Sequence, residues 1–201
     1  QFRSSLSEPS NTLGSTMKIE NVINQCDDGK PRSRKFETVD KLIVHRIGES
    51  LGTTGEEIAE AFRDTSRWAA GSYTGGEHPY HFIIRKDGTI DQCLTLGDHA
   101  PHARRWNASG LAVALIGDFR DAEPPPEQWN ALTRFCGLWM LYGLKLYGHD
   151  ELPGGSKDPS KACPGKMLNM DSLRILADAY AAEMARTAVE WAGVSFETYE
   201  T

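Results

Sequence analysis

Short apolar runs, separated by polar and turn-forming segments, predict the strands of a sheet. The runs at 42–45 and 111–116 are almost continuously apolar, which is typical of strands covered on both faces. A run at 80–85 is followed by Asp-Gly at 87–88 and by a second run at 89–93, a pattern that predicts a β-hairpin. The sequence therefore predicts a sheet in which 111–116 is central.

Longer segments place apolar residues three and four positions apart, as amphipathic helices do. The first opens with Thr-Thr and Glu-Glu within 53–57, which resembles a capping box, and is expected to end near Gly71. The second is expected over 127–147, ended by Gly148, and the third from about 171 to 193. The order of these elements predicts an α/β fold with a mixed central β-sheet and helices packed on its faces.

The chain has 201 residues and shows no internal repeat or change of composition that would divide it, so we expect a single domain. That domain is assigned to 39–193. Residues 1–38 are polar and poorly periodic and are expected to form a flexible N-terminal extension, while 194–201 are expected to form a tail. The segment 1–16 is rich in Ser, Asn, Pro and Gly and is interpreted as a leader, a tag or a flexible arm, with Met17 as an alternative native start.

The composition is that of an ordinary globular protein, and the net charge of −6 disfavours general binding to phosphate backbones. The longest uncharged stretch, 106–117, is shorter than the roughly 20 apolar residues of a membrane-spanning helix. Residues 1–20 lack the apolar segment of a signal peptide, and the four cysteines form no CxxC pair. We therefore expect a monomer, made in the cytoplasm with reduced thiols, that binds no nucleic acid and does not span a membrane.

His45, His149 and Cys163 are the candidates for metal chemistry. Imidazole and thiolate are good zinc ligands, and three protein ligands leave the fourth position of the metal open, as catalytic sites require. No local motif joins these residues, however. From spacing alone, a core histidine, a surface histidine and an inert thiol stay the simpler interpretation.

Five segments, read in order, change that balance. They are the apolar run ending in His45, Tyr-His-Phe-Ile-Ile with Asp-Gly-Thr at 80–89, His-Ala with Trp-Asn at 99–107, the apolar run at 111–119, and Gly-His-Asp-Glu at 148–151 with Lys-Ala-Cys-Pro at 161–164. Together they resemble the zinc-dependent N-acetylmuramoyl-L-alanine amidases of type 2. This family includes a small phage amidase called lysozyme and the animal peptidoglycan recognition proteins. The resemblance covers about residues 39–185, so 39–193 is read as an amidase type 2 catalytic domain.

The resemblance implies one zinc ion per chain, with His45, His149 and Cys163 at the positions of the three ligands. Some relatives use Asp as the third ligand, so Cys163 places this chain with the Cys type. Recognition proteins without catalysis usually lose that Cys, and this chain keeps it.

The resemblance also implies two catalytic residues, Tyr80 and Lys161. Lys161 has the charge to stabilise an oxyanion, and Tyr80 has a hydroxyl that can contact the attacking water or pass a proton to the leaving amine. Some bacterial relatives place a Glu in the strand at 111–116, where this chain has Ala114. That departure puts the chemistry on Tyr80 and Lys161.

Residues of the loop 94–109 are candidates for substrate binding. The resemblance makes His99 a wall of the site and not a metal ligand. Trp106 is the candidate for stacking on the sugar or peptide in a groove. Arg104, with His102 and Arg105, is a candidate for contact with the acidic peptide, and a solvated loop is the alternative for these three.

The other histidines and cysteines are expected to be structural. Alternation along 80–85 places Tyr80 on one face with Phe82 and Ile84, opposite His81, so His81 is interpreted as a hydrogen-bonded structural histidine. Two cysteines, Cys93 and Cys136, are expected to be small buried hydrophobes. We expect His78 to be an ordinary loop residue.

The implied activity is hydrolysis of the amide bond between N-acetylmuramic acid and L-alanine in peptidoglycan. An endolysin-like phage enzyme that acts on the periplasmic cell wall fits a catalytic domain without an evident wall-binding module. Two alternatives stay open: a peptidoglycan-binding module without catalysis, and a cytoplasmic amidase that recycles soluble muropeptides.

Overall fold

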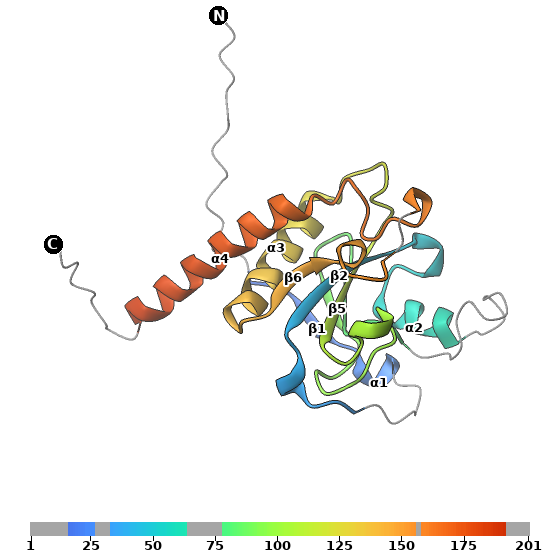
Figure 1. Cartoon of the computed structure of the whole chain (residues 1–201), viewed down its shortest axis with the longest axis horizontal. Helices are drawn as coiled ribbons and strands as arrows, with labels where there is room; N and C mark the ends of the chain where they lie inside the picture. Colours follow the sequence, from blue (N-terminus) through green and yellow to red (C-terminus); the bar gives the residue numbers. More distant parts are fainter. Residues whose placement is uncertain (1–15, 27–32, 64–77, 156–157, 192–201) are drawn as a thin grey trace, which may run out of the picture.

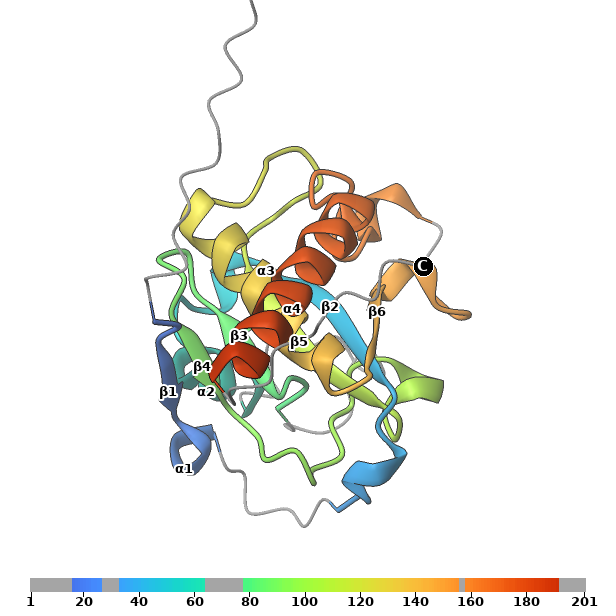
Figure 2. The same cartoon turned by 90° about the vertical axis from the view of Figure 1, so that its left-hand side faces the viewer.

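The computed structural model describes residues 16–26, 33–63, 78–155 and 158–191. Within these ranges, six strands form one sheet in the order β1-β4-β3-β5-β2-β6 (Figures 1 and 2). The strands are β1 Ile19–Asn21, β2 Lys41–Ile47, β3 Phe82–Ile84, β4 Ile90–Gln92, β5 Gly110–Ile116 and β6 Lys145–Gly148. The helices are α1 Ile23–Cys26, α2 Gly55–Arg63, α3 Pro126–Leu141 and α4 Met170–Trp191. The predicted α/β fold with a mixed sheet is confirmed.

Strand β5 is central, as its apolar run predicted. It pairs in parallel with β2 on one side and β3 on the other, and all seven of its residues are buried. Strand β6 continues the parallel set beside β2, whereas β4 runs antiparallel to β3 and closes the predicted hairpin. Gly148 at the carboxyl end of β6 lies beside Val44, three residues before the end of β2.

The two faces of the sheet have separate cores. Helices α3 and α4 pack on one face (Figures 1 and 2). Their side chains meet residues such as Val44 and Val113 there. Helix α2 covers the other face, where Ile58 and Phe62 pack with Ile47. Because side chains alternate along a strand, His45 faces the α2 side while its neighbour Val44 faces α3 and α4.

Helix α2 begins with the capping box that the sequence predicted. The backbone N–H of Glu57 donates to Thr54 Oγ1 at 3.2 Å, and the Glu57 carboxylate accepts from the backbone N–H of Thr53 at 2.7 Å. The first bond satisfies a backbone N–H of the first helical turn, and the second holds Thr53, the residue before the N-cap Thr54. The predicted continuation of this helix to Gly71 lies outside the described residues.

The helix predicted over 127–147 is too long. Helix α3 ends at Leu141, and Gly143 then adopts a left-handed conformation with φ of +85°. The chain continues as β6, in which the buried Leu146 lies between the exposed Lys145 and the half-buried Tyr147. Apolar residues continue across this junction, so helical spacing concealed a four-residue strand. Gly148 consequently ends a strand and not a helix.

The region 1–38 also differs from our expectation of a flexible extension. Its described part contributes β1, which pairs in parallel with β4, and Cys26 of α1 is buried against the α2 side of the sheet. The guanidinium of Arg34 donates to the backbone carbonyl of Gly110 at 2.6 Å, which ties this segment to the start of β5. Residues 1–15 and the tail 194–201 lie outside the described residues. Along the described part of the chain, no helix has both the length and the apolar surface needed to cross a membrane.

Candidate active site and metal centre

The structure brings together the three residues that were predicted to bind metal. His45 lies on β2, His149 directly follows β6, and Cys163 lies in the loop before α4. Val44 and Gly148 are paired in the parallel β2–β6 ladder, so the two histidines leave adjacent strands at the same level. One ligand atom from each of His45, His149 and Cys163 lies within 4.8 Å of the other two.

The geometry of this donor set fits zinc. Nδ1 of His45 lies 3.6 Å from Sγ of Cys163, and the ring centroids of His45 and His149 are 4.6 Å apart. Zinc bonds of about 2.0–2.3 Å in a tetrahedral arrangement place neighbouring ligand atoms roughly 3.5 Å apart. A set of two imidazoles and one thiol at these distances suits a tetrahedral zinc ion with one open position.

His102 orients the imidazole of His45. Nε2 of His102 lies 3.2 Å from the Gly110 carbonyl oxygen and so carries the proton that it donates. Nδ1 of His102 is then the acceptor in the 3.0 Å contact with Nε2 of His45. The proton of His45 is thereby held on Nε2, and its Nδ1 presents a lone pair toward Cys163. Metal-binding histidines generally depend on such a partner for the nitrogen that does not bind the metal.

Burial keeps the three imidazoles neutral. It lowers the pKa of His45 well below the usual range, lowers that of His102 to about 3, and lowers that of His149. Neutral imidazole is the form that binds metals. Burial also raises the pKa of the Cys163 thiol to about 11, so metal binding at this thiol requires release of its proton.

Backbone hydrogen bonds fix Cys163 beside His149. The Asp150 carboxylate accepts from the backbone N–H of Cys163 at 2.5 Å, and the backbone N–H of Asp150 donates to the Cys163 carbonyl at 2.9 Å. Arg46, the residue after His45, donates through Nε to the Ala162 carbonyl at 2.8 Å. The residues next to the candidate ligands in the sequence thus hold the three segments together: Asp150 bonds to Cys163, and Arg46 bonds to Ala162.

Tyr80 lies beside the candidate metal centre. Its ring centroid is 5.3 Å from that of His45 and 6.2 Å from that of Phe62 on α2. The prediction that Tyr80 shares a face with Phe82 and Ile84 was wrong, because β3 begins only at Phe82 and Tyr80 packs with the α2-side core. The irregular backbone before the strand turns the ring toward His45.

Lys161 ends the short 3-10 turn Pro159–Lys161, two residues before Cys163, and its side chain is exposed. The chain therefore brings its ammonium group to the solvent side of the loop that carries Cys163. Ala114 is paired with His45 in the ladder between β2 and β5 and is fully buried. Its methyl group confirms that β5 supplies no carboxylate at this position.

The loop 94–109 covers one side of the site. Trp106 donates through Nε1 to the Pro153 carbonyl at 3.2 Å, and the ammonium of Lys41 lies 4.9 Å from the centroid of its ring. Arg104 opens the short turn Arg104–Trp106 with an exposed side chain, and His99 is half-buried. The expectation that His102 contacts the substrate was wrong, because the residue is only 8% exposed and its ring contacts His45.

Sequence reasoning missed the roles of His102 and Asp150. The loop position of His102 gave no sign that its ring would turn inward, whereas the Gly-His-Asp-Glu segment at 148–151 held a signal for Asp150. The prediction for His81 is confirmed: it is fully buried, its Nδ1 accepts from the backbone N–H of Ala112 at 3.1 Å, and its Nε2 lies 2.9 Å from the Asp98 carbonyl oxygen.

A family model described as N-acetylmuramoyl-L-alanine amidase matches residues 35–166. The chain is 32% identical over 93 residues to an endolysin of Klebsiella phage KP32, which covers 42% of this chain and 57% of that protein. It is 29% identical over 89 residues to a peptidoglycan-recognition protein of Drosophila simulans, which covers 44% of this chain and 48% of that protein. The matched part thus spans about half the length of these curated relatives.

Solved structures share the fold. The Ph2119 endolysin from Thermus scotoductus MAT2119 bacteriophage Ph2119 matches with a TM-score of 0.61 and 20% identity, over 80% of this chain and 99% of that one. The amidase LysC from Clostridium intestinale URNW matches with a TM-score of 0.59 and 21% identity, over 80% of this chain and 97% of that one.

Proposed function

The chain belongs to the N-acetylmuramoyl-L-alanine amidase family, and we propose that it is a zinc-dependent enzyme that hydrolyses the amide between N-acetylmuramic acid and L-alanine in peptidoglycan. The observation that carries this proposal is the convergence of His45, His149 and Cys163 within 4.8 Å. The hydrogen bond from His45 to His102 adds to it, because it leaves the nitrogen facing Cys163 unprotonated.

His45 Nδ1, a ring nitrogen of His149 and the Cys163 sulfur would hold the zinc ion. When bound, zinc supplies Lewis acidity that makes water nucleophilic near neutral pH and polarises the amide carbonyl. The protein's part is to keep the ligand atoms in place and in the correct protonation state. The contacts of His102 with His45, and of Asp150 with Cys163, support that function.

Tyr80 and Lys161 would act on the substrate. The position of Tyr80 beside His45 suits a hydroxyl that orients the attacking water or hands a proton to the leaving amine of L-alanine. Lys161 is tethered to Cys163 by a single intervening residue and is exposed to solvent, so its ammonium can reach a bound substrate. Its charge would stabilise the negative charge that develops on the carbonyl oxygen.

The loop 94–109 would bind the rest of the substrate. Trp106 offers an aromatic surface for sugar or peptide, Arg104 offers a cation for carboxylates of the stem peptide, and His99 would form a wall of the groove. The phage relative favours an endolysin-like enzyme that acts on the periplasmic wall. A peptidoglycan-binding module without catalysis is the second candidate, favoured by the similarity to recognition proteins and opposed by the complete ligand set.

The test is release of new L-alanine amino groups from purified murein sacculi. The zinc-loaded chain should release them, the chelated chain should not, and added zinc should restore release. Cys163→Ser should lose the zinc ion of this site together with activity, because a hydroxyl is a much poorer zinc ligand than a thiolate. Cys136→Ser changes a buried thiol in the core on the α3 and α4 side and is the matched control. It should keep both the metal and the activity.

Full activity without metal would overturn the zinc mechanism. Binding to sacculi without release of amino groups by the zinc-loaded chain would favour the binding module. A comparison with soluble anhydro-muropeptide separates the biological settings: preference for sacculi supports a lysin, and preference for the soluble fragment supports recycling.

A further inference from the structure

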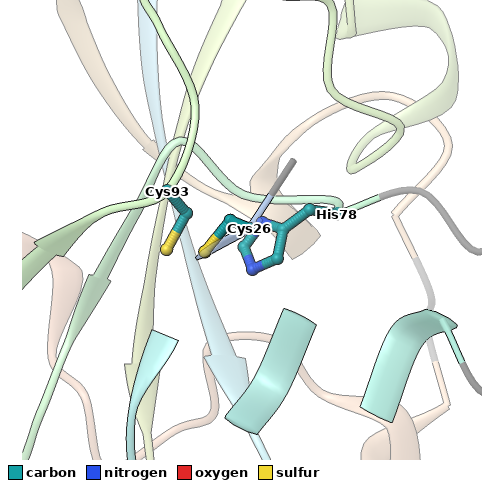
Figure 3. A group of neighbouring side chains, drawn as sticks. All are labelled: Cys26, His78 and Cys93. Carbon is teal, nitrogen blue, oxygen red and sulfur yellow. The ribbon is translucent and has the colours of Figure 1, made fainter. Parts of the chain in front are cut away.

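A second group of histidine and cysteine side chains that could hold a metal ion lies apart from the candidate ligands His45, His149 and Cys163. Cys26 ends α1, His78 precedes β3, and Cys93 follows β4, so three distant parts of the sequence meet there (Figure 3). One ligand atom from each lies within 4.8 Å of the other two. The three residues are almost completely buried, with 1%, 1% and 0% of their surfaces exposed, so His78 is not the ordinary loop residue that we expected. Two thiols and an imidazole thus converge in the core on the α2 side of the sheet.

The surroundings of this cluster leave its sulfur atoms available to a metal. The Cys26 thiol donates to the Gly55 carbonyl at 3.6 Å, and the Cys93 thiol donates to the Asp91 carbonyl at 3.8 Å. Both are weak hydrogen bonds of thiols, which a metal–sulfur bond would replace. The nearby Asp91 carboxylate is already engaged by Arg85 at 2.6 and 2.8 Å and by the backbone N–H of Gly55 at 2.7 Å.

The imidazole of His78 is oriented by the backbone of the candidate catalytic residue Tyr80. Its Nδ1 lies 2.8 Å from the Tyr80 carbonyl oxygen, closer than the 3.3 Å to the Tyr80 backbone nitrogen, and this short contact places the proton on Nδ1. Nε2 is then the nitrogen that carries a lone pair. This arrangement is the one that metal-binding histidines commonly show, with one ring nitrogen hydrogen-bonded and the other on the metal.

Gly55 at the start of α2 completes the enclosure. A Cβ atom at this position would lie 2.8 Å from the Cys93 sulfur and 2.9 Å from Cβ of Asp91, so only glycine lets the helix approach this closely. Its carbonyl oxygen lies 3.6 Å from the Cys26 sulfur, so the first residue of α2 closes the cluster on this side.

We propose that Cys26, His78 and Cys93 bind a second zinc ion with a structural role, separate from the candidate catalytic metal. Two thiolates and an imidazole are soft and borderline donors that favour zinc over magnesium or calcium. On binding, two S–H bonds break, their protons go to solvent, and two sulfur–metal bonds and one nitrogen–metal bond form. No change of oxidation state is required.

A metal at this site would fix the position of the backbone that leads to Tyr80. The metal would join α1, the end of β4 and the segment that leads into Tyr80. Because His78 is two residues before Tyr80 and is bonded to its carbonyl, a metal on His78 would hold the backbone from which the tyrosine reaches His45. The N-terminal segment 16–26 would thereby support the active site without touching the substrate.

Metal analysis of the purified, reduced chain tests this proposal. The wild type should contain about two zinc ions per chain, and Cys163→Ser should retain about one. The double variant Cys26→Ser/Cys93→Ser should also retain about one, and Cys136→Ser should retain both. The second site would be overturned if the wild-type chain saturates at one zinc ion and Cys163→Ser binds none. That result would leave the proposed function intact.

Cobalt substitution gives a measurement that needs no change in the cluster. In Cys163→Ser loaded with Co²⁺, the only cysteine ligands left are those of the cluster, so a sulfur-to-cobalt charge-transfer band should persist. Its absence would contradict the proposal. Alkylation without prior reduction, followed by peptide mass spectrometry, detects the competing chemistry: a Cys26–Cys93 disulfide in the natively folded chain would replace the metal site.

Discussion

The imidazoles of His45 and His102 are joined by a 3.0 Å hydrogen bond between Nε2 of His45 and Nδ1 of His102. The chain of contacts ends at the Gly110 carbonyl, which accepts from His102 at 3.2 Å. Since a backbone carbonyl can only accept, it fixes the tautomer of both rings. The nitrogen of His45 that faces Cys163 therefore holds a lone pair before any metal arrives.

Removing this partner should weaken metal binding. His102→Ala leaves Nε2 of His45 without its acceptor, and changes of this kind typically cost about 10–100-fold in metal affinity. Zinc affinity measured by competition with a chromogenic chelator should fall by that factor. Arg105→Ala, an exposed change in the same loop, should leave zinc affinity unchanged. Equal affinities of His102→Ala and the wild type would show that the hydrogen bond does not orient His45.

The buried histidines also predict how the stability of the metal-free chain depends on pH. Burial lowers the pKa of His102 to about 3 in the folded state, while the unfolded chain keeps a value near 6.5. Between these values the unfolded state binds the extra proton, so the stabilising contribution is complete above pH 6.5 and declines as the pH falls toward 3. The decline from His102 alone is up to about 1.4 kcal/mol per pH unit.

Urea unfolding of the chelated protein at a series of pH values between 7 and 5 measures this slope. His102→Phe removes the titrating ring and should flatten the dependence, since His45 and His149 then carry what is left of it. An unchanged slope in His102→Phe would mean that His102 is not the neutral buried group that the structure describes.

An element of this fold could be predicted from the sequence where burial imposes a clear pattern of apolar residues on it. Strand β5 was predictable because all of its residues are buried and apolar. Strand β1 was not, because it is a short edge strand with a half-buried Glu20 between two exposed residues, and so shows no alternation of apolar and polar positions. Strand β6 was missed because Leu144 and Leu146 continue the apolar spacing of α3 across Gly143.

The residues of the candidate site likewise divide into those that the sequence identified and those that it could not. His45, His149 and Cys163 were found because they stand in recognisable segments, although no spacing along the chain joins them. His102 could not be assigned, since its role depends on a ring turning from an irregular loop into the core. Cys26, His78 and Cys93 come together only through the tertiary fold, because they lie in three separate segments that no local sequence pattern connects.

Tyr80 and Lys161 should be separable from the metal. Tyr80→Phe removes only the hydroxyl and keeps the ring that packs near His45 and Phe62. Lys161→Ala removes an exposed side chain and leaves Cys163 in place. Both variants should keep wild-type zinc content, and the amidase rate should fall roughly 10²–10³-fold for a lost contact to developing charge.

Zinc content and amidase rate must be measured on the same preparation for these variants. Loss of zinc from Lys161→Ala would assign that lysine a structural role. Wild-type rates in both variants would remove Tyr80 and Lys161 from the mechanism.

Asp150 offers a test of how the loop position of Cys163 controls the metal site. Its carboxylate accepts from the backbone N–H of Cys163 at 2.5 Å, while its own N–H donates to the Cys163 carbonyl. Asp150→Ala removes the acceptor, so the N–H of Cys163 loses its partner and the sulfur loses its fixed position relative to His45. Asp150→Asn keeps a carbonyl oxygen at the same place and removes only the charge.

We expect Asp150→Ala to lower zinc affinity about 10–100-fold, in the range of other supporting contacts to metal ligands, and Asp150→Asn to retain most of the wild-type affinity. If both variants lose affinity equally, the negative charge near the zinc ion matters and the hydrogen bond to Cys163 does not. If neither does, the loop holds Cys163 through other contacts, of which the bond from Arg46 to the Ala162 carbonyl is the next to test. Arg46→Ala in the Asp150→Ala background should then release the thiol from His45 and lower zinc affinity further.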